Sequence, residues 1–212
     1  MYQILKLSNY IEENHKKFSN TVLEIYNFMD DISEEYRNFF LWYWKKVVPD
    51  ILNGTREIFI ATINKKIVGV AILKRKKDEK KICSIFVIKE QRNKGIATAL
   101  LEKSFDYLKT NKPLISISEN KLQQFSSIIK KYNWKQEQVL EKGYYNKTSR
   151  EIVFNGKILW LKKFNRVILY WTFFLSFDLK IYLIIVLYIN FQTHHSLVLK
   201  QHFHHIFYLS NI

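Results

Sequence analysis

The chain has 212 residues, with 34 Lys or Arg against 19 Asp or Glu and a formal net charge of +15. This length accommodates one well-buried domain with an appendage and is short for two full domains. The charge favours anionic ligands such as phosphates, nucleic acid or a membrane surface, without selecting among them. The single cysteine, Cys83, excludes an internal disulfide and a cysteine-based zinc site, which indicates a reducing, cytoplasmic compartment.

The first quarter of the chain combines a short strand with helical segments. Residues 3–7 are predicted to form the strand, and residues 12–52 two helices with a break at residues 30–33. Ser33 is a suitable N-cap for the second helix, in which Tyr36 and Phe39 begin an aromatic stripe at helical spacing. Pro49 and the Gly54 turn are expected to end that helix.

Short β-branched runs dominate the following segment and predict a three-stranded antiparallel meander. A polar loop and a helix with an apolar stripe follow it, and then a strand, a helix and two last strands. The final two strands are joined by a loop that contains Tyr144 and Tyr145. The order of elements predicts an α/β fold, in which helices flank a mixed sheet. The expected strands are residues 58–63, 67–73, 82–88, 114–118, 134–140 and 150–154, and the expected helices are residues 96–110 and 121–131.

The segment of residues 85–101 carries the most specific chemical pattern, because a buried strand leads through a basic loop into a helix. Unpaired backbone N–H groups at such a helix start, together with the helix dipole, form an anion-binding site suited to a pyrophosphate. Gly95 allows close approach of the backbone, Ala97 keeps the first turn slim, and Thr98 adds a hydroxyl. The loop has neither the second glycine and lysine of a Walker motif nor a Gly-x-Gly-x-x-Gly fingerprint.

This segment resembles the acetyl-coenzyme A signature of the GNAT superfamily, which is Arg or Gln, two residues, Gly, one residue, and Gly or Ala. The matching positions are Arg92, Gly95 and Ala97. The element order also resembles the family over residues 1–158, so the resemblance implies a GNAT acyl-CoA N-acyltransferase fold with a central mixed antiparallel and parallel sheet. It further implies transfer of an acetyl group from acetyl-CoA directly to a primary amine, with no metal.

The resemblance assigns roles to particular residues. Phe86, Val87 and Ile88 would bind the pantetheine, and a backbone N–H there would polarise the thioester carbonyl. Strands 82–88 and 114–118 would splay apart to admit the cofactor, and Asn120 would lie where it leaves the sheet. The pyrophosphate would be held by the backbone amides of Arg92, Asn93, Lys94, Gly95, Ile96 and Ala97, with the Thr98 side chain.

The general acid departs from the family pattern, because the slot that often holds a tyrosine holds Ile129 here. Tyr132 lies three residues later, and Tyr144 and Tyr145 in the last hairpin loop are equal alternatives. For each tyrosine, a packed ring without a catalytic role is the competing interpretation. Glu57 and Glu90 bracket the relevant strands and are weak candidates for a general base.

Residues 159–212 change in character and are expected to form a hydrophobic extension, separate from the domain of residues 1–158. Apolar runs within residues 167–189 are long enough to span a membrane, but Asp178 and Lys180 make insertion marginal. Three interpretations stay open: a membrane anchor, an appendage packed on the domain or on a second subunit, and an unselected extension. The five histidines of this segment lack the partners typical of a metal site.

Two classes of function follow from these patterns. The first is an N-acetyltransferase acting on a small molecule, peptide, protein or aminoacyl-tRNA. Residues 1–158 carry 29 of the basic and 18 of the acidic residues, a net charge of +11 that is compatible with tRNA. The alternative is a non-catalytic acetyl-CoA-binding or membrane-tethered interaction protein. The sequence indicates neither the acceptor nor the oligomeric state.

Overall fold

The computed structural model describes residues 1–158. The expectations for the hydrophobic extension, its possible membrane span at residues 167–189 and its histidines lie outside the described residues. Within residues 1–158, no helix combines the length and apolar character that crossing a membrane requires.

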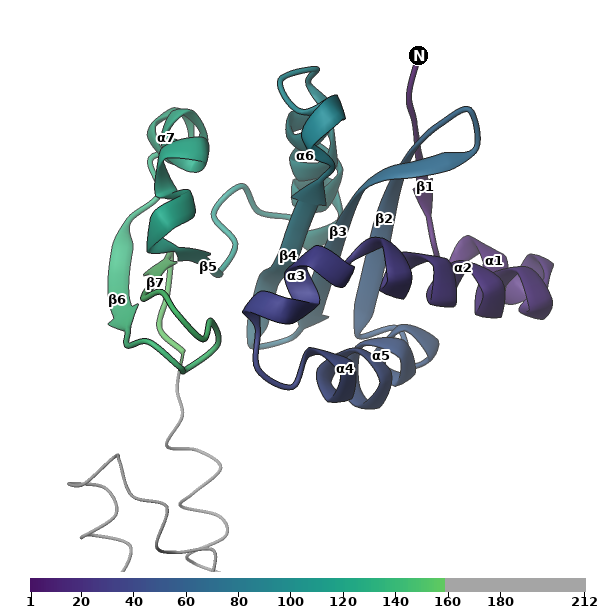
Figure 1. Ribbon diagram of the computed structural model, residues 1–212, viewed down its shortest axis with the longest axis horizontal. Coiled ribbons are helices and arrows are strands. Elements are labelled where there is room, and N and C mark those ends of the chain that lie inside the picture. Colours follow the sequence, from purple (N-terminus) through teal and green to yellow (C-terminus); the bar gives the residue numbers. More distant parts are fainter. Residues whose placement is uncertain (159–212) are drawn as a thin grey trace, which may run out of the picture. The chain divides into compact units, whose positions relative to one another are not determined.

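The first sheet contains four antiparallel strands in the order β1-β2-β3-β4 (Figure 1). The predicted first strand and the predicted meander are therefore confirmed, and all four strands belong to one sheet. An extra residue in β4, Cys83, produces a bulge, because Ile72 pairs with Ser84 while Leu73 pairs with Ile82. The strands are β1 (Gln3–Lys6), β2 (Arg56–Ile63), β3 (Lys66–Lys76) and β4 (Glu79–Val87).

The second sheet has three strands, in the order β5-β7-β6, and all of its pairs are antiparallel. It joins the first sheet through one parallel bridge between Lys81 and Leu114, at the start of β5. Two backbone hydrogen bonds hold this bridge, from Ile82 N to Leu114 O at 3.0 Å and from Leu114 N to Lys80 O at 2.9 Å. The strands are β5 (Ile115–Ser118), β6 (Gln136–Leu140) and β7 (Glu151–Phe154).

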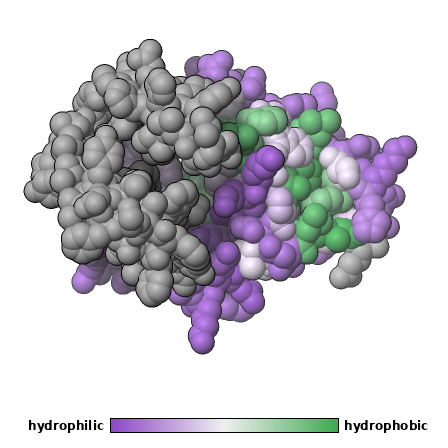
Figure 2. Space-filling view, turned by 90° about the horizontal axis from the view of Figure 1, so that it is seen from below, coloured by the Kyte–Doolittle hydropathy of each residue, from purple (hydrophilic) through white to green (hydrophobic). Residues whose placement is uncertain are grey.

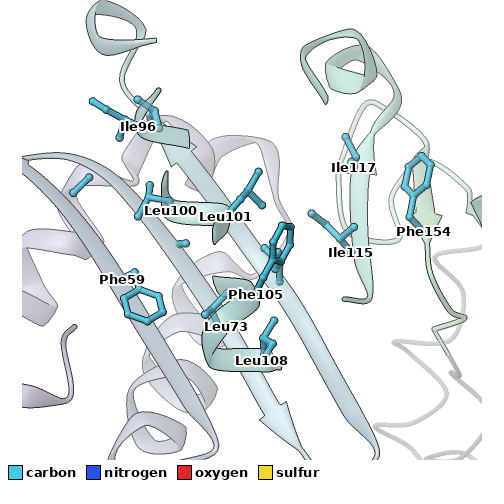
Figure 3. Close-up of a cluster of buried hydrophobic side chains, with 14 of the residues drawn as sticks. Phe59, Leu73, Ile96, Leu100, Leu101, Phe105, Leu108, Ile115, Ile117 and Phe154 are labelled. Atoms are coloured by element: carbon cyan, nitrogen blue, oxygen red, sulfur yellow. The ribbon is translucent and has the colours of Figure 1, made fainter. Parts of the chain in front are cut away.

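The two sheets share an apolar core with the helices α6 (Ile96–Leu108) and α7 (Leu122–Lys131). Leu100 and Leu108 of α6 are fully buried, and alternate residues of β5 and β7 face the same cluster. Figure 3 shows side chains of α6, β5 and β7 gathered in this cluster. Burial of these side chains is the main stabilising contribution to this half of the fold.

The other face of the first sheet is covered by the N-terminal helices, which form a second apolar cluster with β2 and β3. Tyr43 lies in its centre, and its hydroxyl donates a hydrogen bond to the carbonyl of Val22 at 2.8 Å. Phe39 and Tyr43 of the aromatic stripe are buried in this cluster, whereas Phe40 is exposed. The elements are α1 (Asn9–Glu13), α2 (His15–Phe28), α3 (Asp30–Glu35), α4 (Phe39–Trp42), a π-helical turn (Tyr43–Val47) and α5 (Val48–Leu52).

Two details of the helical prediction are wrong. Ser33 lies inside α3 rather than capping a helix, and its hydroxyl bonds to the carbonyl of Asp30. A break at Met29 separates α2 from α3, one residue before the expected range, and a second, unexpected break falls at Tyr36, whose backbone is extended and forms a bridge with Asn146. A tertiary pairing between distant segments therefore overrides the local helical pattern. Pro49 does not end its helix, because it occupies the first turn of α5, where its missing N–H needs no partner.

The surface of the N-terminal helices is partly apolar. Figure 2 views the molecule from below and shows hydrophobic residues gathered on part of the described surface. The large apolar side chains that are exposed on these helices are Leu23, Phe40, Leu41 and Leu52.

Candidate functional site

The basic loop between β4 and α6 ends in a helix N-terminus without a side-chain cap. A 3-10 turn (Lys89–Gln91) follows β4, and Gly95 is the N-cap of α6. The first intrahelical bond runs from Ala99 N to Gly95 O at 3.0 Å. The N–H groups of the preceding turn, Ile96 to Thr98, therefore have no helical acceptor, and no side chain among residues 1–158 caps this end.

Gly95 has the left-handed conformation that its place in the loop requires, with φ of 78°. A Cβ atom at this position would meet no other atom within 4 Å, so the space in front of the backbone is open. Asn93 also has a positive φ, of 62°, and the loop from Arg92 to Gly95 is exposed. The backbone is therefore exposed beside the unpaired amides, which is the arrangement that an anion needs.

Two side chains of the loop are tied back to the protein. The Arg92 Nε donates a hydrogen bond to the carbonyl of Val87 at 3.0 Å, which fixes the guanidinium at the end of β4. The Lys94 Nζ donates to Gln91 Oε1 at 3.1 Å. Ala97 and Thr98, in the first turn of α6, are exposed. Arg92 and Lys94 thus bring positive charge into the exposed loop that leads to the uncapped start of α6.

The end of β4 presents backbone groups away from β3. Ile88 N donates to Val68 O at 3.1 Å, and in an antiparallel ladder the backbone direction alternates from residue to residue. Phe86 thus also faces β3, whereas Val87 faces the opposite side, in agreement with its carbonyl accepting from Arg92. Of the three residues expected to bind pantetheine, Val87 is the one whose amide faces away from the first sheet.

The strands β4 and β5 separate beyond their single bridge. They run parallel from Lys81 and Leu114, and no further pairing joins them within residues 1–158. Val87 and Ser118 therefore end two strands that start together and belong to different sheets. The geometry agrees with the splayed strands expected from the sequence.

Asn120 lies directly after β5, in a 3-10 turn (Glu119–Lys121), and is exposed. Its Oδ1 accepts a hydrogen bond from the Ser118 hydroxyl at 2.6 Å. Because β4 and β5 are parallel, Asn120 follows the same end of its strand that the basic loop follows in β4.

The three candidate tyrosines do not come together. Tyr132 caps the end of α7, and its ring makes an edge contact with Phe105 at 4.9 Å in the core between α6 and α7. Ile129, in the slot typical of the acid, packs against the same core. Asn133, directly after Tyr132, has a positive φ of 49°.

Tyr144 and Tyr145 lie on the loop of residues 141–150, with their rings 4.6 Å apart. Lys81 Nζ of β4 lies 5.1 Å from the centre of the Tyr145 ring. Burial and the nearby Cys83 and Glu151 raise the pKa of Tyr145 to about 12. Burial also raises the pKa of Tyr144. Both hydroxyls therefore stay protonated at neutral pH and can act as proton donors.

A buried polar cluster on the second sheet was not found from the sequence. Side chains alternate along β7, so Ile152 and Phe154 enter the apolar core while Glu151 lies on the opposite face. Burial raises the pKa of Glu151, whereas hydrogen bonds from Ser116 and Tyr36 lower it. In the strand that follows Arg150, the alternation of side chains is the sequence signal that separates Glu151 from the apolar core. Nothing in the sequence links Tyr36 to β7.

The two carboxylates that are weak candidates for a general base differ in their surroundings, because one is buried and the other is exposed. Glu57 is buried, its Oε1 accepts from the amides of Ser8 and Ile58, and its Oε2 lies 3.5 Å from Lys6 Nζ. Glu57 therefore holds the start of α1 against β2. Glu90 is exposed in the turn after β4.

Comparisons with known proteins point to one family. A family model described as an acetyltransferase (GNAT) domain matches residues 9–136. A solved GNAT-family protein from Desulfovibrio desulfuricans is 13% identical, covers 73% of this chain and 97% of its own, and has a TM-score of 0.50. A GNAT-family acetyltransferase from Streptococcus pneumoniae is 14% identical, covers 73% and 98%, and also has a TM-score of 0.50.

A further solved structure, a GNAT family acetyltransferase from Elizabethkingia anophelis with acetyl-CoA bound, is 20% identical, covers 51% of this chain and 80% of its own, and has a TM-score of 0.39. Among curated proteins, no sequence matches the chain significantly.

Proposed function

Because the chain belongs to the GNAT acetyltransferase family, we propose that it transfers an acetyl group from acetyl-CoA directly to a primary amine. The observation that carries this proposal is the uncapped start of α6 beside the open space at Gly95. The backbone amides of Arg92 to Ala97, with the Thr98 hydroxyl, would bind the pyrophosphate there. Asn120 would contact the cofactor at the end of β5.

The separation of β4 from β5 supports a path for the pantetheine between the two sheets. The Val87 amide, which faces away from β3, would donate to the thioester carbonyl as negative charge develops on its oxygen. An amine on the other side of the thioester would attack the carbonyl carbon directly. The protein then has to supply positioning, removal of protons from the amine and a proton for the leaving thiolate.

Tyr145 of the 141–150 loop lies beside β4, the strand that would bind the pantetheine. The Tyr145 ring lies against Lys81 of β4, whereas the Tyr132 ring packs on Phe105 in the core. Tyr145, with Tyr144 beside it, is therefore the proposed acid.

The proposal is tested by thiol release from acetyl-CoA with a panel of amines: a polyamine, an aminoglycoside, peptides with a free α-amino group or a lysine, and an aminoacyl-tRNA. Turnover with at least one amine is expected. Binding of acetyl-CoA without turnover on any of them would favour the alternative, a non-catalytic acetyl-CoA-binding protein.

The pyrophosphate site at Gly95 is tested by Gly95→Asn, because asparagine tolerates a positive φ and its side chain would fill the open space. The matched control is Gly54→Asn, since Gly54 has φ of 73° and also faces open space. We expect Gly95→Asn to weaken acetyl-CoA binding while Gly54→Asn leaves it unchanged. Equal affinities of the two variants would contradict a pyrophosphate site at Gly95.

A further inference from the structure

Glu151 is an acidic side chain in a place where charge is costly. It is 1% exposed, in a strand whose other three residues are apolar and buried. It pairs with Ser118 of β5 and shares its face with Ser116. A carboxylate in such surroundings is stable only if hydrogen bonds or opposite charges compensate for the lost hydration.

The compensation is incomplete. Tyr36 and Ser116 hydrogen-bond to the carboxylate, but its Oε1 has no partner. Among residues 1–158 it is the one buried side-chain nitrogen or oxygen atom in that position. An unsatisfied buried acceptor destabilises a native fold, so it calls for an explanation.

The neighbouring charges do not supply the missing partner. Lys121, on the turn after β5, lies 2.5 Å from Glu35 of α3, and Lys81 of β4 lies over the Tyr145 ring. Both lysines act on Glu151 at longer range, and no ion pair within residues 1–158 includes it. The groups facing Glu151 are therefore Tyr36 from the α3–α4 connection, Tyr145 from the 141–150 loop, Ser116 from β5, and the two lysines.

This cluster lies where the two sheets separate. Tyr145 lies beside the first sheet, because Lys81 Nζ of β4 is 5.1 Å from the centre of its ring, and it is near enough to Glu151 of β7 for the carboxylate to raise its pKa. The Tyr36 segment reaches the same place, because it bridges to Asn146 and because Arg37 N donates to Tyr145 O at 3.1 Å. Glu151 thus lies beside the separation of β4 and β5, on the face away from α6 and α7.

We infer that Glu151 accepts a proton from the amine that receives the acetyl group. This amine is a cationic primary amine that approaches on the face of Tyr36 and Tyr145. This inference rests on the proposed function. Because Oε1 is buried and has no partner, one water would link it to the ammonium group and carry the proton to it. The neutral amine then attacks the thioester carbon, the N–C bond forms and the C–S bond breaks.

The proton balance closes with the groups present. The ammonium nitrogen loses two protons in becoming an amide: one passes to Glu151 and later to solvent, and the other replaces the proton that Tyr145 gives to the coenzyme A thiolate. Burial raises the pKa of Glu151 above its ordinary value and raises that of Tyr145 to about 12. Such a separation suits the carboxylate to accept and the tyrosine to donate.

The test compares Glu151→Gln with the wild type and with Glu141→Gln, an exposed matched control on the neighbouring loop. Acetyl-CoA affinity is measured by calorimetry, and kcat/KM is measured against pH with an amine that the wild type uses. We expect Glu151→Gln to bind acetyl-CoA as the wild type does, to lose about 100-fold or more in kcat/KM, and to lose the rise in rate with pH. Glu141→Gln should match the wild type.

Ser116→Ala provides a second variant in case Glu151→Gln fails to fold. Removal of this hydrogen bond should raise the pKa of Glu151 further and shift the rising limb of the pH profile to higher pH. Wild-type rates and pH profiles in both variants would overturn the inference and leave the proposed function intact. Absence of acetyl-CoA binding by the wild type would instead overturn the proposed function.

Discussion

Glu151 makes the stability of the fold depend on pH in a direction that can be measured. Its folded-state pKa is raised by burial, so the protonated form is favoured in the native protein. Its stabilising contribution is complete below the unfolded pKa of about 4.3 and is lost as pH rises through the folded pKa. Glu151→Gln, which does not titrate, should therefore gain stability relative to the wild type as pH rises above that range.

Urea unfolding at a series of pH values checks this expectation. Glu119→Gln serves as a control of opposite sign, because the hydrogen bond from Arg150 lowers the pKa of Glu119. Glu119→Gln should therefore lose stability relative to the wild type as pH rises. A stability difference between Glu151→Gln and the wild type that does not vary with pH would show that burial does not perturb this carboxylate.

Gly69 lets β4 and α6 approach β3 closely. A Cβ atom on Gly69 would lie 3.1 Å from a Val87 methyl group and 3.2 Å from a Leu100 methyl group and from the Phe86 carbonyl. Gly69→Ala should therefore cost about 1–3 kcal/mol in unfolding free energy and displace the end of β4. Because the Val87 N–H is the proposed hydrogen-bond donor to the thioester carbonyl, kcat should also fall. Wild-type stability and kcat in this variant would show that the neighbours adjust without cost.

At the scale of elements, the start of α6 should respond in opposite directions to one substitution. Ala97→Glu places a negative charge in the exposed first turn, where it interacts favourably with the helix dipole by about 0.3–1 kcal/mol. The same charge would lie in the pyrophosphate site and repel the pyrophosphate. We expect a slightly higher melting temperature together with weaker acetyl-CoA binding, whereas the neutral Ala97→Gln should change both much less.

Calorimetry and thermal unfolding of the two Ala97 variants check this expectation. Equal acetyl-CoA affinity in Ala97→Glu and Ala97→Gln would place the diphosphate elsewhere.

The elements that the sequence predicted well are those whose pattern is local. The alternation and β-branched residues of β2, β3 and β4 and the apolar stripe of α6 are visible within single segments. The break at Tyr36 was missed because its cause, the bridge to Asn146, lies 110 residues away in the sequence. The loop proposed to bind the diphosphate could be identified because its groups are contiguous in the chain.

The polar cluster of the second sheet could not be predicted, because its residues lie far apart in the sequence. Tyr36, Lys81, Ser116 and Glu151 come from four separated elements, and only the fold brings them together. Glu57 and Glu90 are candidate bases in the sequence because they flank strands of the meander. The amides of Ser8 and Ile58 occupy Glu57, and Glu90 lies on the surface. The sequence thus locates the proposed cofactor site better than the proposed acceptor site.

At the scale of the whole molecule, we propose that residues 1–158 form the catalytic domain and that residues 159–212 are not needed for cofactor binding. The family match lies within residues 9–136, and both apolar cores are built from residues 1–158. A chain ending at Ile158 should therefore fold cooperatively and bind acetyl-CoA with the affinity of the full chain. Loss of binding on truncation, measured by calorimetry, would contradict this division.

The most direct test of the account titrates the full chain with acetyl-CoA and, separately, with S-acetylpantetheine, which lacks the nucleotide and the diphosphate. Hydrogen bonds to a charged group contribute about 1.5–3 kcal/mol each, so two lost amide contacts predict more than a tenfold difference. We expect acetyl-CoA to bind, and S-acetylpantetheine to bind at least about tenfold more weakly. Equal affinities, or no heat with acetyl-CoA, would contradict a diphosphate site at the start of α6.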